Sequence, residues 1–346
     1  MREIYLDNNA TTKIAPEVLE TMRPYFDEFF GNPSSLHKKG IEAERALKES
    51  RRVLAGIFHV KEGDVFFTSG ATESDNWALR GVAHALKNKG NKIVTTKVEH
   101  EAVLETCKQL EKEGFEVAYL DVDESGSVDV DNMLSEVDDK TIMVAVMHVN
   151  NELGTIYPIN DLAKKAKDKK SDVVFFSDGV QAVGKTEINL ENIDLYSISA
   201  HKIHGPKGSG ALIAKEGVKL LPLLYGGGQE SGMRSGTENV PGAVGLAKAV
   251  EISCENIEKN KEFAAVMKER FIRTLLDIED VRINSPKNSV SSTVNAAFKG
   301  IPAEVLLHAL EEEGVYASTG SACANNKQST SHVLQAVNVP YEYINS

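Results

Sequence analysis

The segment DLYSISAHKIHGPKGSGALIA, residues 194–214, decides the fold. It places two short apolar runs, 194–199 and 210–214, on either side of a polar loop rich in glycine. Runs of this kind, bounded by turn residues, are typical of buried β-strands. In an open α/β sheet, functional residues gather in the loops just beyond the carboxyl ends of the strands. The segment therefore predicts a strand, a functional loop and a second strand.

Outward from this segment, the first two-thirds of the chain alternates amphipathic helical patterns with short apolar runs. That alternation is typical of a mostly parallel sheet joined by crossover helices. We therefore expect an α/β fold with a mostly parallel seven-stranded sheet in a large domain. The other strands are expected at 65–68, 92–96, 116–120, 141–146 and 172–176. The helices are expected at 16–29, 37–58, 71–88, 101–113, 129–137 and 159–169.

The pattern changes near residue 240. A long helix, a strand and two further helices are expected at 240–277, 290–298, 302–313 and 329–337. We interpret this part as a smaller α/β domain that the N-terminal segment completes. The expected division is 15–250 for the large domain and 1–14 with 251–346 for the small one.

Composition argues against several classes of function. The 346 residues carry a formal net charge of −12, with 41% hydrophobic and 26% charged residues. This is the balance of a globular protein, and the acidic charge argues against nucleic acid and anionic membranes as partners. The beginning, MREIYLDNNATT, has no signal-peptide pattern, and no apolar run approaches a membrane span. Three cysteines without C-x-x-C spacing predict no metal site and a reducing compartment, so we expect a cytoplasmic protein.

Two loops after predicted strands carry groups that suit a charged ligand. In TSGATES (68–74), a helix start at Ala71 supplies backbone N–H groups, and the Thr72 hydroxyl adds a donor for an anion. In SDGVQ (177–181), Asp178 follows an apolar run, where a carboxylate needs a cationic partner or several hydrogen bonds. An ordinary helix cap would explain either loop when it is taken alone.

The loop SAHKIHGPKGSG (199–210) adds Lys202, flanked by His201 and His204. A lysine in a partly desolvated site has a lowered pKa and can form a Schiff base as a neutral amine. Surface charge is the commoner role of a single lysine. A nucleotide-binding loop is a further alternative, but G-P-K-G-S-G has neither Walker nor Rossmann spacing. An anion-binding helix start, a strand-end aspartate and this lysine in one sheet together indicate a phosphorylated aromatic aldehyde.

The same loop resembles the lysine motif of the class V aminotransferase family, in particular its cysteine desulfurase branch that serves iron–sulfur cluster assembly. The resemblance implies the fold of type I pyridoxal 5′-phosphate (PLP) enzymes, which is aspartate aminotransferase-like, with PLP as cofactor. The similarity runs from Tyr5 to the end of the chain. The other matching segments are YLDNNATT (5–12), FGNPSSLH (30–37), TSGATES (68–74), EHEAVLET (99–106), HVNNELGT (148–155), GGGQESGMRSGT (226–237) and GSAC (320–323).

The resemblance implies a role for each candidate site residue. Lys202 would carry the PLP aldehyde, and Asp178 would pair with the ring nitrogen. His100 would stack on the ring and move protons, although a place at a helix N-terminus would also explain it. Asn151 is expected near the ring and substrate, and Gln181 near the ring hydroxyl. The implied phosphate ligands are Ala71, Thr72, Ser199, His201 and, from the second subunit of a homodimer, Thr237.

Cys323 lies in ASTGSACANNKQSTS (317–331), whose small and polar residues predict a surface loop. Sulfur transfer needs a thiolate that reaches the substrate and leaves with its cargo, whereas Cys107 and Cys254 lie in helical patterns. The resemblance implies removal of sulfur from L-cysteine, which gives L-alanine and a persulfide on Cys323. An iron–sulfur scaffold protein is the implied acceptor, with thiolation pathways for tRNA or cofactors as the alternative. With the scaffold as acceptor, Cys323 is expected to contact an iron–sulfur cluster during transfer.

Alternatives from the same family are a selenocysteine lyase and a small-molecule aminotransferase; a third is a non-catalytic sulfur-relay or scaffold subunit. The loop cysteine argues against an aminotransferase, and intact Lys202, His100 and Cys323 argue against a scaffold. Family members continue past VPYEYINS (339–346) with a segment carrying the arginine that holds the substrate carboxylate. We therefore expect the small domain to be truncated at its C-terminus, and Arg234 is no convincing substitute.

Overall fold

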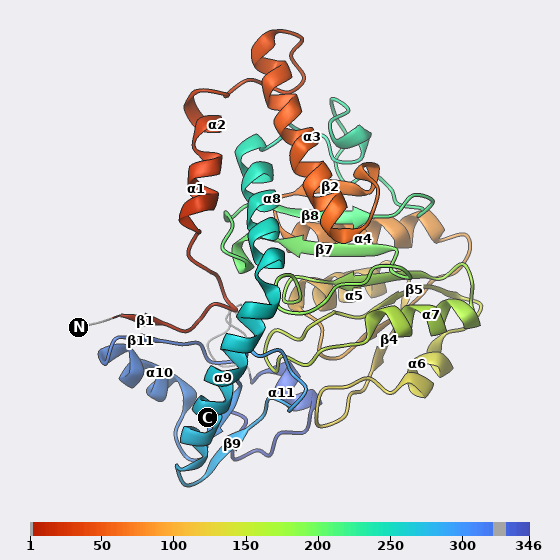
Figure 1. Ribbon diagram of the computed structural model, residues 1–346. Helices are drawn as coiled ribbons and strands as arrows, with labels where there is room; N and C mark the ends of the chain where they lie inside the picture. The colour runs from red at the N-terminus through yellow and green to blue at the C-terminus, as the bar shows by residue number, and fades with distance from the viewer. Residues whose placement is uncertain (1–2, 321–329) are drawn as a thin grey trace.

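A seven-stranded sheet organises the structure (Figure 1). The computed structural model describes residues 3–320 and 330–346. The strand order is β2-β8-β7-β6-β5-β3-β4, and every pair is parallel except the two that β8 forms. The mostly parallel seven-stranded sheet expected from the sequence is confirmed. Its strands are β2 (Val65–Thr68), β3 (Lys92–Thr96), β4 (Glu116–Leu120), β5 (Thr141–Ala145), β6 (Val174–Asp178), β7 (Leu195–Ser199) and β8 (Gly210–Ala214).

Apolar side chains cover both faces of the sheet. Because side chains alternate along a strand, Phe175 and Phe176 of β6 join different apolar clusters on opposite faces. Leu195 and Tyr196 of β7 are divided in the same way. Each fully buried side chain of this size stabilises the fold by roughly 1.5–3 kcal/mol. The sheet is therefore a rigid platform for the loops at its edge.

Helices provide the other half of each cluster (Figure 1). On one face, Trp77 and Leu110 bury the apolar sides of α4 (Ala71–Leu86) and α5 (Glu101–Lys112). On the other face, Leu54 and Leu162 belong to the cluster formed with the remaining helices. Those helices are α3 (Lys38–Phe58), α6 (Val130–Glu136), α7 (Ile159–Lys169) and α8 (Val240–Glu255).

Shorter elements lie outside the sheet, with the N-terminal strand beside the C-terminal part of the chain (Figure 1). β1 (Ile4–Tyr5) pairs in parallel with β11 (Val315–Tyr316), and β9 (Val281–Ile283) pairs antiparallel with β10 (Ala296–Phe298). The other α-helices are α1 (Pro16–Met22), α2 (Pro24–Asp27), α9 (Ile257–Leu276), α10 (Ala303–Glu312) and α11 (His332–Ala336). Three 3₁₀ helices are η1 (Glu62–Asp64), η2 (Ala200–Lys202) and η3 (Glu230–Gly232). Within the described ranges, no helix is long and apolar enough to cross a membrane.

A few expected elements are wrong in their bounds. The helix expected at 16–29 is divided at Arg23, because Pro24 opens a new helix and supplies no N–H to the preceding one. The long helix expected from 240 is divided at Asn256, and position 250 lies inside α8. The strand expected at 290–298 shrinks to β10, since Thr293 closes a turn onto Val290.

Candidate active site

Three titratable side chains meet at the carboxyl edge of the sheet. Asp178 ends β6, His100 is the residue before α5, and Asp75 lies in α4. One ligating atom from each lies within 4.8 Å of those of the other two. Asp75 and Asp178 are 0% and 5% exposed. The structure therefore brings together the predicted residues Asp178 and His100, and adds a second buried carboxyl.

The two buried carboxyls differ in their surroundings. Asp178 Oδ1 accepts a hydrogen bond from the Val180 backbone N–H at 2.9 Å, and Asp75 Oδ1 accepts one from the Ser197 hydroxyl at 2.6 Å. Burial raises the pKa of Asp178, while nearby cationic side chains oppose the rise. Burial and then the charge of Asp178 raise the pKa of Asp75 well above its ordinary value. Because two such carboxyls do not readily ionise together, Asp75 holds the proton and Asp178 is the one suited to a cationic partner.

His100 caps helix α5. Its Nδ1 accepts a hydrogen bond from the Ala102 backbone N–H at 3.1 Å, so His100 occupies the helix N-terminus that was the alternative explanation for this residue. With Nδ1 as acceptor, the neutral ring carries its proton on Nε2. Burial lowers the pKa of His100, and the charge of Asp178 acts in the opposite direction. A neutral imidazole held in this way presents its Nε2–H as a hydrogen-bond donor.

Lys202 ends η2, one turn beyond β7, so it does not lie at the strand end itself as predicted. The side chain is half-buried. Its Nζ donates to the backbone carbonyls of Asn9 at 2.5 Å and Ala10 at 2.9 Å. The N-terminal segment also holds the loop itself, because the Thr12 N–H donates to the His201 carbonyl at 2.8 Å. Backbone oxygens thus hold the amine in position.

The start of α4 is the place where the sequence predicts an anion site. Gly70 is the N-cap with φ of 152°, and among the described side chains none caps this helix, so its first N–H groups are available to a ligand. Ala71 and Thr72 are the first two residues of the helix. A Cβ placed on Gly70 would lie 3.9 Å from the Ser199 hydroxyl. The end of β7 therefore faces the helix start, and the predicted phosphate ligands Ala71, Thr72 and Ser199 lie together.

Three further predicted residues border the N-terminal segment. Asn9 Nδ2 donates to the Asn151 carbonyl at 3.2 Å, and Gln181 Nε2 donates to the Asn9 carbonyl at 3.1 Å. His201 Nδ1 and the Thr11 hydroxyl are 3.2 Å apart. Burial, followed by the charges of nearby lysines, lowers the pKa of His201 to about 4, so the ring is neutral at neutral pH. All three predicted residues therefore lie around the segment that also contacts Lys202.

Two other predicted residues stand apart from this set. Thr237 is exposed, in the loop whose Arg234 pairs with Glu73 of α4 at 2.9 Å. Cys323 lies outside the described residues. Among its described neighbours in sequence, Ser331 donates its hydroxyl to Glu152 Oε2 at 2.6 Å.

Sequence reasoning missed Asn9, Asp75 and Lys185 as members of the site. Asn9 lies inside the quoted motif YLDNNATT, and Asp75 directly follows TSGATES. Asp75 is fully buried in a helix that packs on the sheet, and Lys185 follows Gln181 in the turn after β6. A lysine close to a functional loop was the signal that could have found Lys185, whereas Asn9 and Asp75 left no such signal in the sequence.

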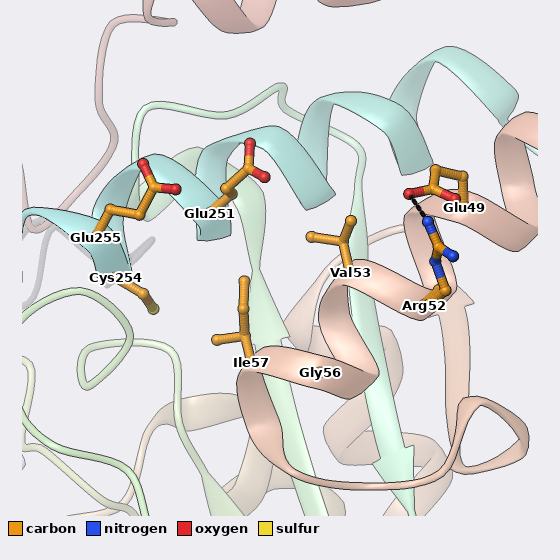
Figure 2. Close-up of a pocket in the computed structure, with 8 residues that line it drawn as sticks. All are labelled: Glu49, Arg52, Val53, Gly56, Ile57, Glu251, Cys254 and Glu255. Carbon is orange, nitrogen blue, oxygen red and sulfur yellow. Dashed lines mark hydrogen bonds and ion pairs between the residues drawn. The ribbon is translucent and has the colours of Figure 1, made fainter.

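A surface groove offers a contrast to this site. Figure 2 shows it between α3 and α8, with a volume of about 340 Å³. The side chains of Glu49, Glu251 and Glu255 line it, so it repels an anionic ligand. Burial raises the pKa of Cys254 on the same groove, which makes this thiol a poor nucleophile. Its lining includes no predicted site residue.

The donor set at the sheet edge fits a phosphorylated pyridine aldehyde. The helix start at Ala71 suits a phosphate, and the buried Asp178 carboxyl suits a protonated ring nitrogen. Lys202 supplies an inward amine for an aldehyde, and His100 supplies a neutral aromatic ring. Next to Asp178, the buried Asp75 Oδ2 has no hydrogen-bond partner among the described residues, as expected where a polar ligand belongs.

Fold and site define a PLP-dependent enzyme of fold type I. The family model described as aminotransferase class-V matches residues 4–339, so the chain belongs to the class V aminotransferase family. A protein named cysteine desulfurase IscS from Clostridium botulinum is 46% identical over 99% of this chain and 87% of that protein. Another of the same name from Dictyoglomus turgidum is 47% identical, with the same coverage of both chains. These relatives place the chain among the PLP-dependent cysteine desulfurases.

Solved structures agree with this assignment. A NifS-like protein matches with a TM-score of 0.95 at 38% identity, over 100% of this chain and 92% of that one. A structure described as SspA in complex with cysteine matches with a TM-score of 0.87 at 34% identity, over 99% of this chain and 96% of that one. The expected fold and the expected family are therefore confirmed.

Proposed function

We propose that this protein removes sulfur from L-cysteine, releases L-alanine and carries the sulfur as a persulfide on Cys323 for iron–sulfur cluster assembly. The observation that supports this most strongly is the 46% identity to a cysteine desulfurase IscS over 99% of the chain. The meeting of Asp178, His100 and Lys202 at one sheet edge supports it independently. The solved relative described in complex with cysteine supports the substrate.

In this proposal Lys202 is the residue that tethers PLP, and Asp178 faces the ring nitrogen. Gln181 and Asn151 would hold the ring, and His100 would contribute its aromatic ring to the same site. The backbone at Ala71 and the side chains of Thr72, Ser199 and His201 would hold the phosphate. PLP, when bound, stabilises negative charge at the substrate α-carbon. The chain's contribution is to hold it, to orient the substrate and to move protons.

The proton transfers are assigned to residues that the structure places side by side. Lys202, once its amine is released, accepts the proton from the substrate α-carbon. His100 holds a proton on Nε2 when neutral and exchanges it with the substrate or the nucleophile. Asp178 stays ionised opposite a cationic ring nitrogen, since opposite charges favour each other's charged forms.

The sulfur step is assigned to Cys323. Its thiolate attacks the substrate sulfur, a sulfur–sulfur bond forms, and the bond between that sulfur and the substrate β-carbon breaks. The electron pair of the broken bond stays with the carbon fragment, which takes up protons and leaves as L-alanine. Cys323 retains the second sulfur as a persulfide, ready for an acceptor thiol or a forming cluster.

We further propose a homodimer in which Thr237 reaches the phosphate of the neighbouring subunit. The exposure of Thr237 on its loop supports this arrangement. A large domain at 15–250 and a small one made of 1–14 with 251–346 are supported by the pairing of β1 with β11. An iron–sulfur scaffold protein as acceptor and a cytoplasmic location follow from the persulfide chemistry, which needs a reducing compartment.

The visible spectrum of the purified protein tests the proposal. The parent protein should absorb in the visible range from bound PLP, and L-cysteine should change that band and release alanine. Lys202→Ala should lose the covalently bound PLP; a retained covalent link would assign the cofactor to another lysine. Cys323→Ser should keep the PLP band and form no sulfide, and unchanged sulfide release would refute the role of Cys323.

A further inference from the structure

Lys185 is a second lysine at the site, and the proposed reaction does not use it. It follows β6 in the turn that also carries Gln181. Its Nζ donates to Gln181 Oε1, and to Asn9 Oδ1 at 3.2 Å. The residue is half-buried, while its amine lies inward against the buried Gln181. Lys185 therefore holds the side chains of two residues that border Lys202.

Asn9 links the two lysines. Its backbone carbonyl accepts hydrogen bonds from Gln181 Nε2 at 3.1 Å and from Lys202 Nζ at 2.5 Å. Its side-chain Nδ2 donates to the Asn151 carbonyl at 3.2 Å and to the Thr293 hydroxyl at 2.9 Å. Lys185 donates to the side-chain Oδ1. Both polar atoms of the Asn9 side chain and its backbone carbonyl therefore take part in hydrogen bonds. Because both lysines contact Asn9, a movement of Lys185 would move Asn9 and so change the position of Lys202.

An inward amine carries a cost in free energy that calls for a reason. Burial, with the charge of Lys202 as a smaller cause, lowers the pKa of Lys185 to about 7. A methionine would fill similar space without that cost. Lys215 is a useful contrast: burial also lowers its pKa, but it contacts the backbone carbonyls of Leu190 and Glu191, away from the site.

We propose that Lys185 is a positioning residue for the cofactor site, which fixes the Gln181 amide and the Asn9 backbone beside Lys202. A glutamine amide has one accepting and two donating sites, and it can turn over to exchange them. In the structure, Lys185 Nζ donates to Gln181 Oε1, which leaves Nε2 directed to Asn9 and the cofactor side. The inference rests on the proposed function, because it assigns Gln181 to the border of the PLP ring.

The first experiment compares Lys185→Met with Lys215→Met in the holoenzyme. Loss of the two hydrogen bonds that Lys185 donates to Gln181 and Asn9 predicts that PLP leaves the Lys185→Met protein about tenfold faster. The PLP absorbance maximum should shift, and kcat should fall with KM for L-cysteine nearly unchanged. Lys215→Met should keep the parent values. Equal behaviour of the two variants in all these measurements would overturn the proposal.

The second experiment is a double-mutant cycle with Gln181→Ala. Because Lys185 contacts both Gln181 and Asn9, the effect of Lys185→Met on PLP release should shrink to about threefold in the Gln181→Ala protein, where only the contact with Asn9 Oδ1 remains. Fully additive effects would contradict the proposal. Lys185→Gln keeps a neutral hydrogen-bond donor of similar length, so this variant should retain most of its PLP. It replaces Lys185→Met in the double-mutant cycle if the methionine variant does not fold. A parent protein without bound PLP would instead refute the proposed function.

Discussion

The central sheet and the C-terminal part of the chain are packed very differently. Every residue of β3, β5, β6, β7 and β8 is buried, whereas α9 buries only Leu275 and α10 buries none of its residues. Regions with few buried apolar contacts open at a lower free energy. The chemistry of the site rests on the rigid part, at the ends of β6 and β7. Asp178 and Ser199, whose positions must be fixed, thus end fully buried strands. The C-terminal segment that contacts Glu99 and Glu152 belongs to the part of the chain with fewer buried residues.

The largest expected effect comes from removing the charge of Asp178, at the end of the fully buried strand β6. Asp178→Asn should lower kcat about a thousandfold, because loss of a fixed charge opposite the reacting group has an effect of that order. Asp75→Asn is the matched control, since it changes the neighbouring carboxyl that holds a proton. It should lower kcat less than tenfold, because an amide resembles a neutral acid. Steady-state kinetics on both variants measures the difference; equal losses would mean that Asp75 is the ionised group.

The packing contrast itself predicts the second effect. Leu54 of α3 is 0% exposed, and Leu54→Ala should lower the free energy of unfolding by about 3 kcal/mol. Leu306 of α10 is half-buried, and Leu306→Ala should cost about 1 kcal/mol. Urea unfolding of the two variants checks this. Similar losses would show that the C-terminal part is packed as tightly as the sheet.

The same contrast explains how much of the fold the sequence could predict. The expected bounds of β2, β3, β4 and β8 match the structure, because each of these strands is a short run rich in apolar residues between polar loops. In the C-terminal part, 290–298 was expected as one strand, but only β10 forms. Of the three residues of β10 only Ala297 is buried, so the apolar pattern of this segment gives little information about where the strand begins and ends. Contacts across the chain, rather than local pattern, decide those elements.

The site was predictable to a similar degree. Asp178, Ser199 and the loop of Lys202 follow apolar strands, so their place at one edge could be deduced from the alternation of strands and helices. Asn9 could not be placed in this way, because the N-terminal segment reaches the site from outside the sheet and its contacts with Lys202 join distant parts of the chain. Asp75 lies on the buried side of a helix, where a protonated acid leaves no pattern of its own.

The third prediction concerns a buried acid that joins the two regions. Glu99 accepts hydrogen bonds from Thr96 at 2.8 Å and from the Met147 N–H at 3.0 Å, and its carbonyl lies 3.0 Å from His332 Nε2 of α11. Burial raises the pKa of Glu99 to about 8. Since the unfolded chain releases this proton near its ordinary pKa and the folded chain keeps it, stability is lost as the pH rises from about 4 to about 8.

Glu99→Gln should remove that loss, because an amide keeps the accepting oxygen and does not ionise. Relative to the parent, the variant should gain on the order of 2 kcal/mol in free energy of unfolding between about pH 5 and pH 7. Glu304→Gln, at an exposed position of α10, is the control. The difference between its free energy of unfolding and that of the parent should not change with pH. Urea unfolding between about pH 5 and pH 7 measures both differences. If the difference in free energy of unfolding between Glu99→Gln and the parent did not change with pH, Glu99 would be ionised in the folded protein.

The smallest effects are expected from the two described cysteines, one in each kind of environment. Cys107 is 0% exposed in the cluster between α5 and the sheet, and Cys254 is half-buried on the groove of Figure 2. Cys107→Ala should lower the free energy of unfolding by about 1 kcal/mol, since it removes one buried sulfur atom, and Cys254→Ala by less. Burial raises the pKa of Cys107 to about 12 and also raises that of Cys254, so neither supplies a thiolate at neutral pH. Sulfide release should therefore stay at the parent rate in both variants and in the double variant. A loss of sulfide release without a loss of stability would assign sulfur transfer to the packed interior or the groove instead of Cys323.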